Sequence, residues 1–97
     1  MANVATGTPG EGPIRVSVIS PERVVYEGDA DQVVAPAWDG EVGILRNHAP
    51  MMVLLGSGQL RIRLRNSEEH FLVSGGFLQV IDNVVTVLSE RAEADVI

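Results

Sequence analysis

The stretch Asp39–Gly56, which reads DGEVGILRNHAPMMVLLG, predicts a strand, an exposed loop and a buried segment in direct succession. It opens on an Asp-Gly turn, and Glu41–Leu45 then alternates in polarity as a strand does. Arg46–Pro50 is a polar loop that holds a histidine, and the apolar run Met51–Leu55 follows at once. This succession is typical of a sheet edge that presents a loop.

The chain has 97 residues, which is the length of one domain. Hydrophobic residues make up 45% of it and aromatic residues only 4%, so the core is expected to be aliphatic. Thirteen acidic residues against seven arginines, with no lysine, give a net charge of −6. This balance argues against nucleic-acid binding, because that affinity comes mostly from neutralising phosphates with basic side chains.

The absence of cysteine excludes disulfides, thiolate metal sites and cysteine nucleophiles, and it fits a cytosolic protein. No signal peptide is expected, since the N-terminus has no charged segment followed by an apolar one. The longest apolar run, Ala49–Leu55, is far too short to cross a bilayer. Any membrane association is therefore expected to come through a partner.

Period-2 alternation and β-branched residues predict further strands on both sides of the opening stretch. These strands are Ile14–Val18, Val24–Tyr26, Gln32–Ala35 (closed by Pro36), Leu60–Leu64, Phe71–Val73, Phe77–Ile81 and Val84–Leu88. Turn signals recur every 8–12 residues or so, and no helical pattern appears before Ser89. The sequence thus predicts an all-β fold, a two-sheet antiparallel β-sandwich of about nine or ten short strands.

Composition divides the chain into three parts. Residues 1–13 are small residues, glycine and proline without periodicity, which predicts a disordered leader. Residues 14–89 are the β-sandwich domain, and residues 90–97 are a short tail. The segment Ser89–Ile97 is rich in alanine and glutamate and favours the start of a helix, although it is too short to be stable alone.

The residue patterns for a metal site, a catalytic triad and a phosphate loop are all incomplete in this sequence. His48, His70 and Glu41 could together bind zinc or iron, yet they share no metal-ligand spacing, and the histidines suit a backbone-bonded loop residue and a solvent-facing strand residue. A Ser-His-Asp triad lacks the strand-to-helix turn that presents its nucleophile. The two Gly-Ser-rich turns lack the helix and lysine of a phosphate loop. We therefore expect no catalytic residue, no cofactor and no metal.

Two surface features each fit two roles. Arg61, Arg63 and Arg65 share one strand face, where they either form a solvated surface paired with Glu68 and Glu69 or bind an acidic partner. Trp38 lies beside a turn, where a tryptophan is either a lid on the core or an exposed anchor for a partner. Tryptophan is the residue most enriched at interface hot spots, and with Asp39 and Gly40 beside it we expect it to be exposed.

From Ile14 to about Arg91 the chain resembles the N-terminal β-sandwich domain of the epsilon subunit of the rotary F-type ATP synthase. The matching segments, in order, are Ser20-Pro21-Glu22, Gly40–Leu45, His48-Ala49-Pro50, Gly58–Arg61, Val73–Phe77 and Val85–Leu88. Each segment alone is weak evidence for this family, but their order and spacing together make the match specific.

The resemblance implies a non-catalytic central-stalk (rotor) subunit that links the gamma subunit to the membrane c-ring and supports the coupling of proton transport to ATP synthesis. It implies a peripheral place at the cytoplasmic face of the bacterial inner membrane, reached only through the complex, with no small-molecule substrate. Carried over by position, the implied gamma contacts are Ser20, His48, Met51, Met52 and Val53. The implied contacts to the polar c-ring loops are Trp38, Asp39 and Glu41.

The chain departs from this family in two places. The family usually has Pro-Gly before the histidine, where this chain has Arg46 and Asn47; asparagine tolerates the left-handed conformation of glycine, so the same loop shape is expected. Most members also continue into a C-terminal helical hairpin that inhibits ATP hydrolysis and in some binds ATP. The sequence ends at Ile97, where that hairpin begins, so the resemblance implies that this chain alone lacks the hairpin's functions.

Two alternatives come from other functional classes. One is a free-standing β-sandwich module that binds another protein or a sugar, which would be a stable monomer that ignores gamma. The other is a small metal-dependent enzyme of the cupin type, which would contain stoichiometric metal.

Overall fold

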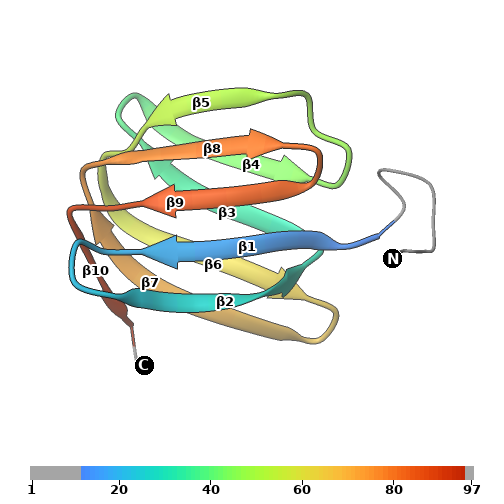
Figure 1. Cartoon of the computed structure of the whole chain (residues 1–97), viewed down its shortest axis with the longest axis horizontal. Helices are drawn as coiled ribbons and strands as arrows, with labels where there is room; N and C mark the ends of the chain where they lie inside the picture. The colour runs from blue at the N-terminus through green and yellow to red at the C-terminus, as the bar shows by residue number, and fades with distance from the viewer. Residues whose placement is uncertain (1–11, 96–97) are drawn as a thin grey trace.

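The computed structural model describes residues 12–95, which form ten strands and no helix (Figure 1). The strands are β1 (Ile14–Ile19), β2 (Val24–Ala30), β3 (Gln32–Ala37), β4 (Gly40–Leu45), β5 (Met51–Leu54), β6 (Ser57–Leu64), β7 (Ser67–Ser74), β8 (Phe77–Ile81), β9 (Val84–Leu88) and β10 (Arg91–Ala94). None of the described segments is a helix that could cross a membrane. The predicted disordered leader is residues 1–13, and only residues 12 and 13 of it are described. The prediction of disorder therefore lies outside the described residues.

The strands form two five-stranded sheets packed face to face. Sheet A has the order β2-β1-β9-β8-β5, and sheet B has the order β10-β7-β6-β3-β4. All pairings are antiparallel except that of β1 with β9. The predicted two-sheet sandwich is confirmed, and the parallel pair is the feature that the strand patterns did not predict.

Side chains that face inward from both sheets make an aliphatic core, as the composition predicted. The largest fully buried side chains are Ile14, Ile44, Leu60, Ile62, Leu78, Val16, Val18, Val33, Val80, Val85 and Val87. Tyr26 on β2 packs on Phe71 on β7, with ring centroids 5.3 Å apart and planes tilted by 54°. This pair joins an edge strand of sheet A to sheet B.

Strand β3 continues through Pro36 to Ala37, beyond the end that the sequence predicted. A proline has no N–H for a sheet ladder, and it normally ends or avoids a central strand. Here β6 pairs with β3 only at Gln32, Val33 and Val34, so no ladder bond is lost at Pro36. The Pro36 carbonyl accepts a bond from the Gly56 N–H at 2.9 Å, so its backbone oxygen stays satisfied.

The predicted start of a helix after Ser89 is wrong over Arg91–Ala94, where the chain forms β10. This strand pairs antiparallel with β7 along the edge of sheet B. The buried Ser89 side chain bends the chain between the sheets, since its hydroxyl donates to the Arg91 carbonyl at 2.6 Å. Tertiary pairing has overridden the helix propensity of alanine and glutamate.

The two ends of the sandwich carry different turns. At the first, which we call the tryptophan end, the Trp38 N–H donates to the Leu54 carbonyl and the Leu55 N–H to the Gly76 carbonyl, each at 3.0 Å. At the second, the histidine end, the loop 46–50 is tied to the β8–β9 turn by a 2.7 Å bond from the Asn47 N–H to Asn83 Oδ1. Strand β4 runs from the first end to the second (Figure 1).

Candidate protein-docking surface

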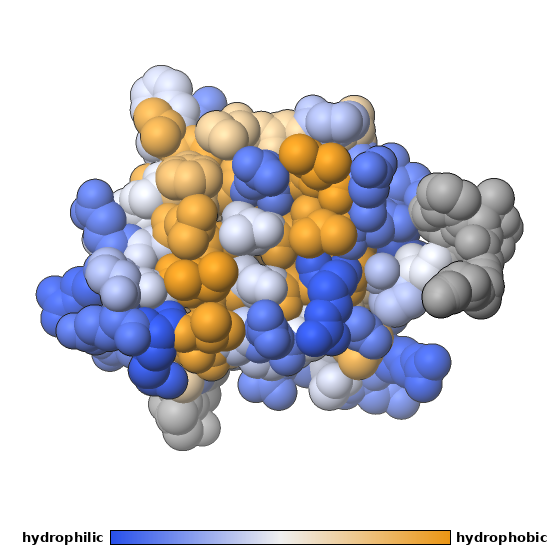
Figure 2. All heavy atoms as spheres, viewed as in Figure 1, coloured by the Kyte–Doolittle hydropathy of each residue, from blue (hydrophilic) through white to orange (hydrophobic). Residues whose placement is uncertain are grey.

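The outer face of sheet A carries a row of apolar side chains that crosses all five strands. Every second residue of a strand faces outward, and strand pairing aligns these residues into columns across the sheet. The column nearest the tryptophan end is apolar at every position and consists of Leu54, Phe77, Leu88, Ile19 and Val24. We call these five residues the apolar column; Figure 2 shows it as the longer orange row.

The neighbouring columns are interrupted by polar side chains. The middle one consists of Met52, Gln79, Thr86, Ser17 and Glu27. The third starts with the exposed pair Ile81 and Val84 but continues into Arg15 and Asp29, which form an ion pair at 3.3 Å. Leu54 in the apolar column is 63% exposed. An apolar strip of this extent on a small domain is typical of a protein-interaction site.

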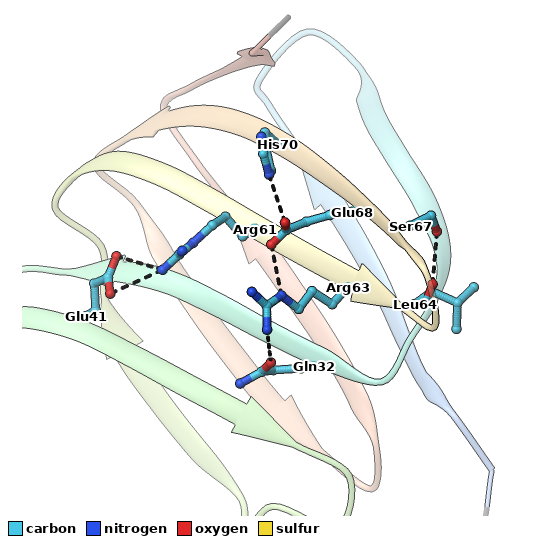
Figure 3. Close-up of polar contacts among 8 residues, drawn as sticks. All are labelled: Gln32, Glu41, Arg61, Arg63, Leu64, Ser67, Glu68 and His70. Carbon is cyan, nitrogen blue, oxygen red and sulfur yellow. Dashed lines mark hydrogen bonds and ion pairs between the residues drawn. The ribbon is translucent and has the colours of Figure 1, made fainter. Parts of the chain in front are cut away.

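The outer face of sheet B is instead a network of charged and polar groups (Figure 3). Arg61 pairs with Glu41 at 3.2 Å, and Arg63 pairs with Glu68 at 3.0 Å. His70 lies 3.4 Å from the second oxygen of Glu68. The Arg61–Glu41 and Arg63–Glu68 pairs are partly exposed to solvent, which screens their attraction. The His70 side chain is only 23% exposed, so the expectation that it faces solvent is wrong. This face therefore matches the solvated surface that was one of the two expectations for the arginines.

Two details of that expectation are wrong. Arg65 does not lie on the strand face, because it sits in the β6–β7 turn at a φ of 55°. Its N–H donates to Asp31 Oδ2 at 3.0 Å. Glu69 lies opposite Ile62, not opposite an arginine.

Glu68 makes the stability of this face depend on pH. The hydrogen bond from Arg63 and then the neighbouring His70 hold the pKa of Glu68 below its usual 4.5. A carboxyl with a lowered pKa in the folded state contributes stability above its unfolded pKa and loses it as the pH falls through the folded value. We therefore expect Glu68→Gln to flatten the decline in stability below about pH 4.5. Urea unfolding at several pH values measures this, and an unchanged slope would contradict it.

The residues assigned to gamma by the resemblance lie at different places. Ser20 closes the β1–β2 turn beside the apolar column, and Met52 faces outward from β5. Met51 and Val53 point the other way and pack against the core. His48 lies at the histidine end, where its Nδ1 donates to the Ala49 carbonyl at 2.7 Å. Asn47 adopts the expected left-handed conformation, with a φ of 68°.

The residues assigned to the c-ring lie together at the tryptophan end. Trp38 is 70% exposed, which confirms the expectation for this side chain. Asp39 follows it in the same turn and is also exposed. The Glu41 carboxylate lies on the outer face of sheet B, where Arg61 donates to both of its oxygens at 3.2 and 3.3 Å.

The alternative metal site is not assembled in the described part of the chain. His48 belongs to the histidine end, His70 lies beside Glu68 on β7, and Glu41 is held by Arg61. Across residues 12–95, no group of three histidine, aspartate or glutamate side chains could hold a metal ion.

Most of the apolar column was missed by sequence reasoning. Only its neighbours Ser20 and Met52 were named, while Phe77, Leu88 and Leu54 were counted simply as strand residues. The sequence did contain a signal. Phe77–Ile81 and Val84–Leu88 each have two consecutive apolar residues at both ends, so both faces of these strands carry apolar side chains there. Such runs predict strands that are covered on both faces. Because the core covers only the inner face, the outer face remains for a partner.

A family model and individual relatives place the chain in the same family. The model of the ATP synthase delta/epsilon chain β-sandwich domain matches residues 13–95. The ATP synthase epsilon chain of Alkalihalophilus pseudofirmus is 48% identical over 80 residues, which cover 82% of this chain and 60% of that relative. That of Leptospira borgpetersenii is 46% identical over 78 residues, which cover 80% and 61%. The chain thus spans about three fifths of the length of these relatives.

Solved structures share the fold at lower identity. A chain of the Euglena gracilis mitochondrial ATP synthase, solved with its c-ring, matches with a TM-score of 0.78 at 20% identity, over 96% of this chain and 62% of that chain. A chain from the central stalk and c-ring of the Tetrahymena thermophila enzyme matches with a TM-score of 0.71 at 20% identity, over 86% and 67%. At this identity the likeness concerns the fold.

Proposed function

Because the chain belongs to the family of ATP synthase delta/epsilon chains, we propose that it is a non-catalytic central-stalk subunit of a rotary F-type ATP synthase. In this role it links the gamma subunit to the c-ring and supports the coupling of proton transport to ATP synthesis. It reaches the cytoplasmic face of the bacterial inner membrane only through that complex. Membership of this family weighs against a free-standing module.

The apolar column is the observation that supports a gamma contact most strongly. It offers a continuous apolar strip beside Ser20 and Met52, whereas the outer face of sheet B is polar and internally paired. Interfaces that persist are apolar at their centre, and charged residues are depleted there. A partner that covers this strip and extends along β5 also reaches His48 at the histidine end.

The β3–β4 turn is the surface that we assign to the c-ring. Trp38 supplies an exposed aromatic side chain, and Asp39 supplies a carboxylate with no ion-pair partner between residues 12 and 95. Glu41 is already neutralised by Arg61, so it contributes less charge to a partner than its sequence position suggested. A free carboxylate next to tryptophan suits polar loops that carry basic groups.

A matched pair of leucines tests the gamma assignment. Leu54→Glu places a charge in the apolar column, and Leu72→Glu places the same charge on the outer face of sheet B, where Leu72 is 44% exposed. We expect Leu54→Glu to weaken binding to purified gamma subunit by at least about a hundredfold, because an unpaired charge would be buried in the contact. Leu72→Glu is expected to bind like the wild type.

The same titration, repeated with detergent-solubilised c-ring and gamma together, tests the other surface. The double variant Trp38→Ser, Asp39→Ser should keep its gamma affinity and lose its added affinity for the ring. Equal weakening by Leu54→Glu and Leu72→Glu would overturn the choice of sheet A. A wild-type chain that binds neither gamma nor the ring would overturn the proposed function.

A further inference from the structure

A depression of about 350 Å³ lies where the apolar column meets the tryptophan end. Strand pairing brings together its walls, which come from the β1–β2 turn, the β7–β8 turn and the chain just after β9. Its lining residues are Ile19, Ser20, Pro21, Gly76, Phe77, Leu88, Ser89 and Glu90. We call this depression the socket; Ile19, Phe77 and Leu88 belong to both the socket and the apolar column.

Close backbone packing brings two walls of the socket together. Gly76 has a φ of 92° and no side chain, so its backbone lies directly against the Leu88 carbonyl and Ser89 Cα, where a Cβ would clash. The pairing of β1 with β2 shifts in register between Val18 and Ile19, because Ile19 pairs with Val24 and Val25 is left without a partner in β1. The depression therefore lies where two turns and the chain after β9 come together.

The polar groups of the socket are already satisfied by the protein. The Ser89 hydroxyl bonds to backbone groups of Ser74 and Arg91, and the Ser89 N–H donates to the Ile19 carbonyl at 2.9 Å. The Ser20 hydroxyl donates to the Arg23 carbonyl and accepts from the Glu22 N–H. The socket thus offers apolar contact and little hydrogen bonding, and its volume is at the small end for a ligand pocket.

Acidic groups lie at its rim. Glu90 lines the socket and makes no ion pair with any residue of the described range. The adjoining depression is lined by Glu22, Arg23, Glu90, Arg91 and Glu93, together with Ser20, Pro21 and Ala92, so acids outnumber arginines there as well. A partner that approaches this corner meets a shallow, open apolar depression with negative charge beside it.

We propose that the socket receives one bulky apolar side chain of the gamma subunit, flanked there by a lysine or arginine that faces Glu90. The inference rests on the proposed function, since the socket is continuous with the apolar column. Buried side chains that fill a pocket at an interface carry most of its binding energy. The socket is therefore the hot spot of the gamma contact, and the rest of the column mainly excludes water.

Strands β8 and β9 supply a matched test. Both Phe77–Leu88 and Ile81–Val84 are outward-facing cross-strand pairs, but only the first lies in the socket. Leu88→Ala should weaken binding to purified gamma subunit by at least about tenfold, and Val84→Ala by less than about threefold. Phe77→Ala and Ile81→Ala should repeat this difference. Urea unfolding of each variant checks that the folded fraction is the same.

A second test fills the socket with a chemical group instead of removing side chains from it. The chain has no cysteine, so Leu88→Cys and Val84→Cys each provide one reactive thiol. After folding, N-phenylmaleimide should abolish gamma binding by the Leu88→Cys variant and leave the Val84→Cys variant unchanged.

The outcomes separate the two proposals. Equal effects at both pairs, with normal wild-type binding to gamma, would overturn the socket and leave the proposed function standing. No binding of the wild type to gamma would overturn the proposed function. Concentration-dependent dimers that dissociate in Leu88→Ala, without gamma binding, would assign the socket to a second copy and overturn the partner proposed here.

Discussion

Gly76→Ala is expected to destabilise the domain by about 2–5 kcal/mol, a large part of the total stability of a domain of this size. Two costs add. An L-residue at a φ of 92° is strained by about 1–2 kcal/mol, and forcing a methyl group into a packed site costs roughly 1–3 kcal/mol more. The added Cβ would lie 1.9 Å from the Leu88 carbonyl oxygen and 2.8 Å from Ser89 Cα, both of them backbone atoms. In urea, the midpoint of unfolding should fall by more than about 1 M.

Two other glycines separate these costs. Gly40 has a φ of 134° with nothing within 4 Å of an added Cβ, so Gly40→Ala should show the backbone strain alone. Gly43 is equally open and has no positive φ, so Gly43→Ala should stay within about 0.5 kcal/mol of the wild type. A Gly76→Ala variant as stable as Gly43→Ala would mean that the β7–β8 turn does not pack against β9 as described.

The fold was largely predictable because its signals are local. Alternation fixed which side of β1 and β6 is buried, and glycine or proline marked the turns between strands. Trp38 and Asn47 were also predictable, since the first sits in a turn and the second tolerates a left-handed conformation. Each of these features depends on residues next to one another in the chain.

The docking surface was less predictable because it depends on strand order. Leu54, Leu88 and Val24 are far apart in the sequence. They come into one column only because the five strands of sheet A pair in this order, with β1 parallel to β9. The strand β10 has the same origin, since only pairing with β7 makes its four residues extended. No local sequence pattern contains the strand order. The family resemblance implied contact residues beside the apolar column, but none of the five residues of the column itself.

The two faces of sheet A should also differ in what their leucines do. Leu78 on β8 is fully buried, whereas Leu54 on the neighbouring β5 is 63% exposed. We expect Leu78→Ala to cost about 2–5 kcal/mol of unfolding free energy, because the removed methyl groups leave a cavity in the core. Leu54→Ala should change it by less than about 0.5 kcal/mol. Urea unfolding of both variants measures the difference.

The two variants should rank in the opposite order when their affinity for the gamma subunit is measured at equal concentrations of folded protein. Leu54→Ala should lose less affinity for the gamma subunit than Leu88→Ala, because Leu54 adds apolar contact to the column outside the socket. Leu78→Ala should keep its affinity, since Leu78 faces the core and reaches no partner. If Leu54→Ala unfolded as readily as Leu78→Ala, the outer face would be buried in the isolated chain and unavailable for docking. Because one side of this sheet holds the fold and the other is open, mutations on the two sides should separate folding from assembly.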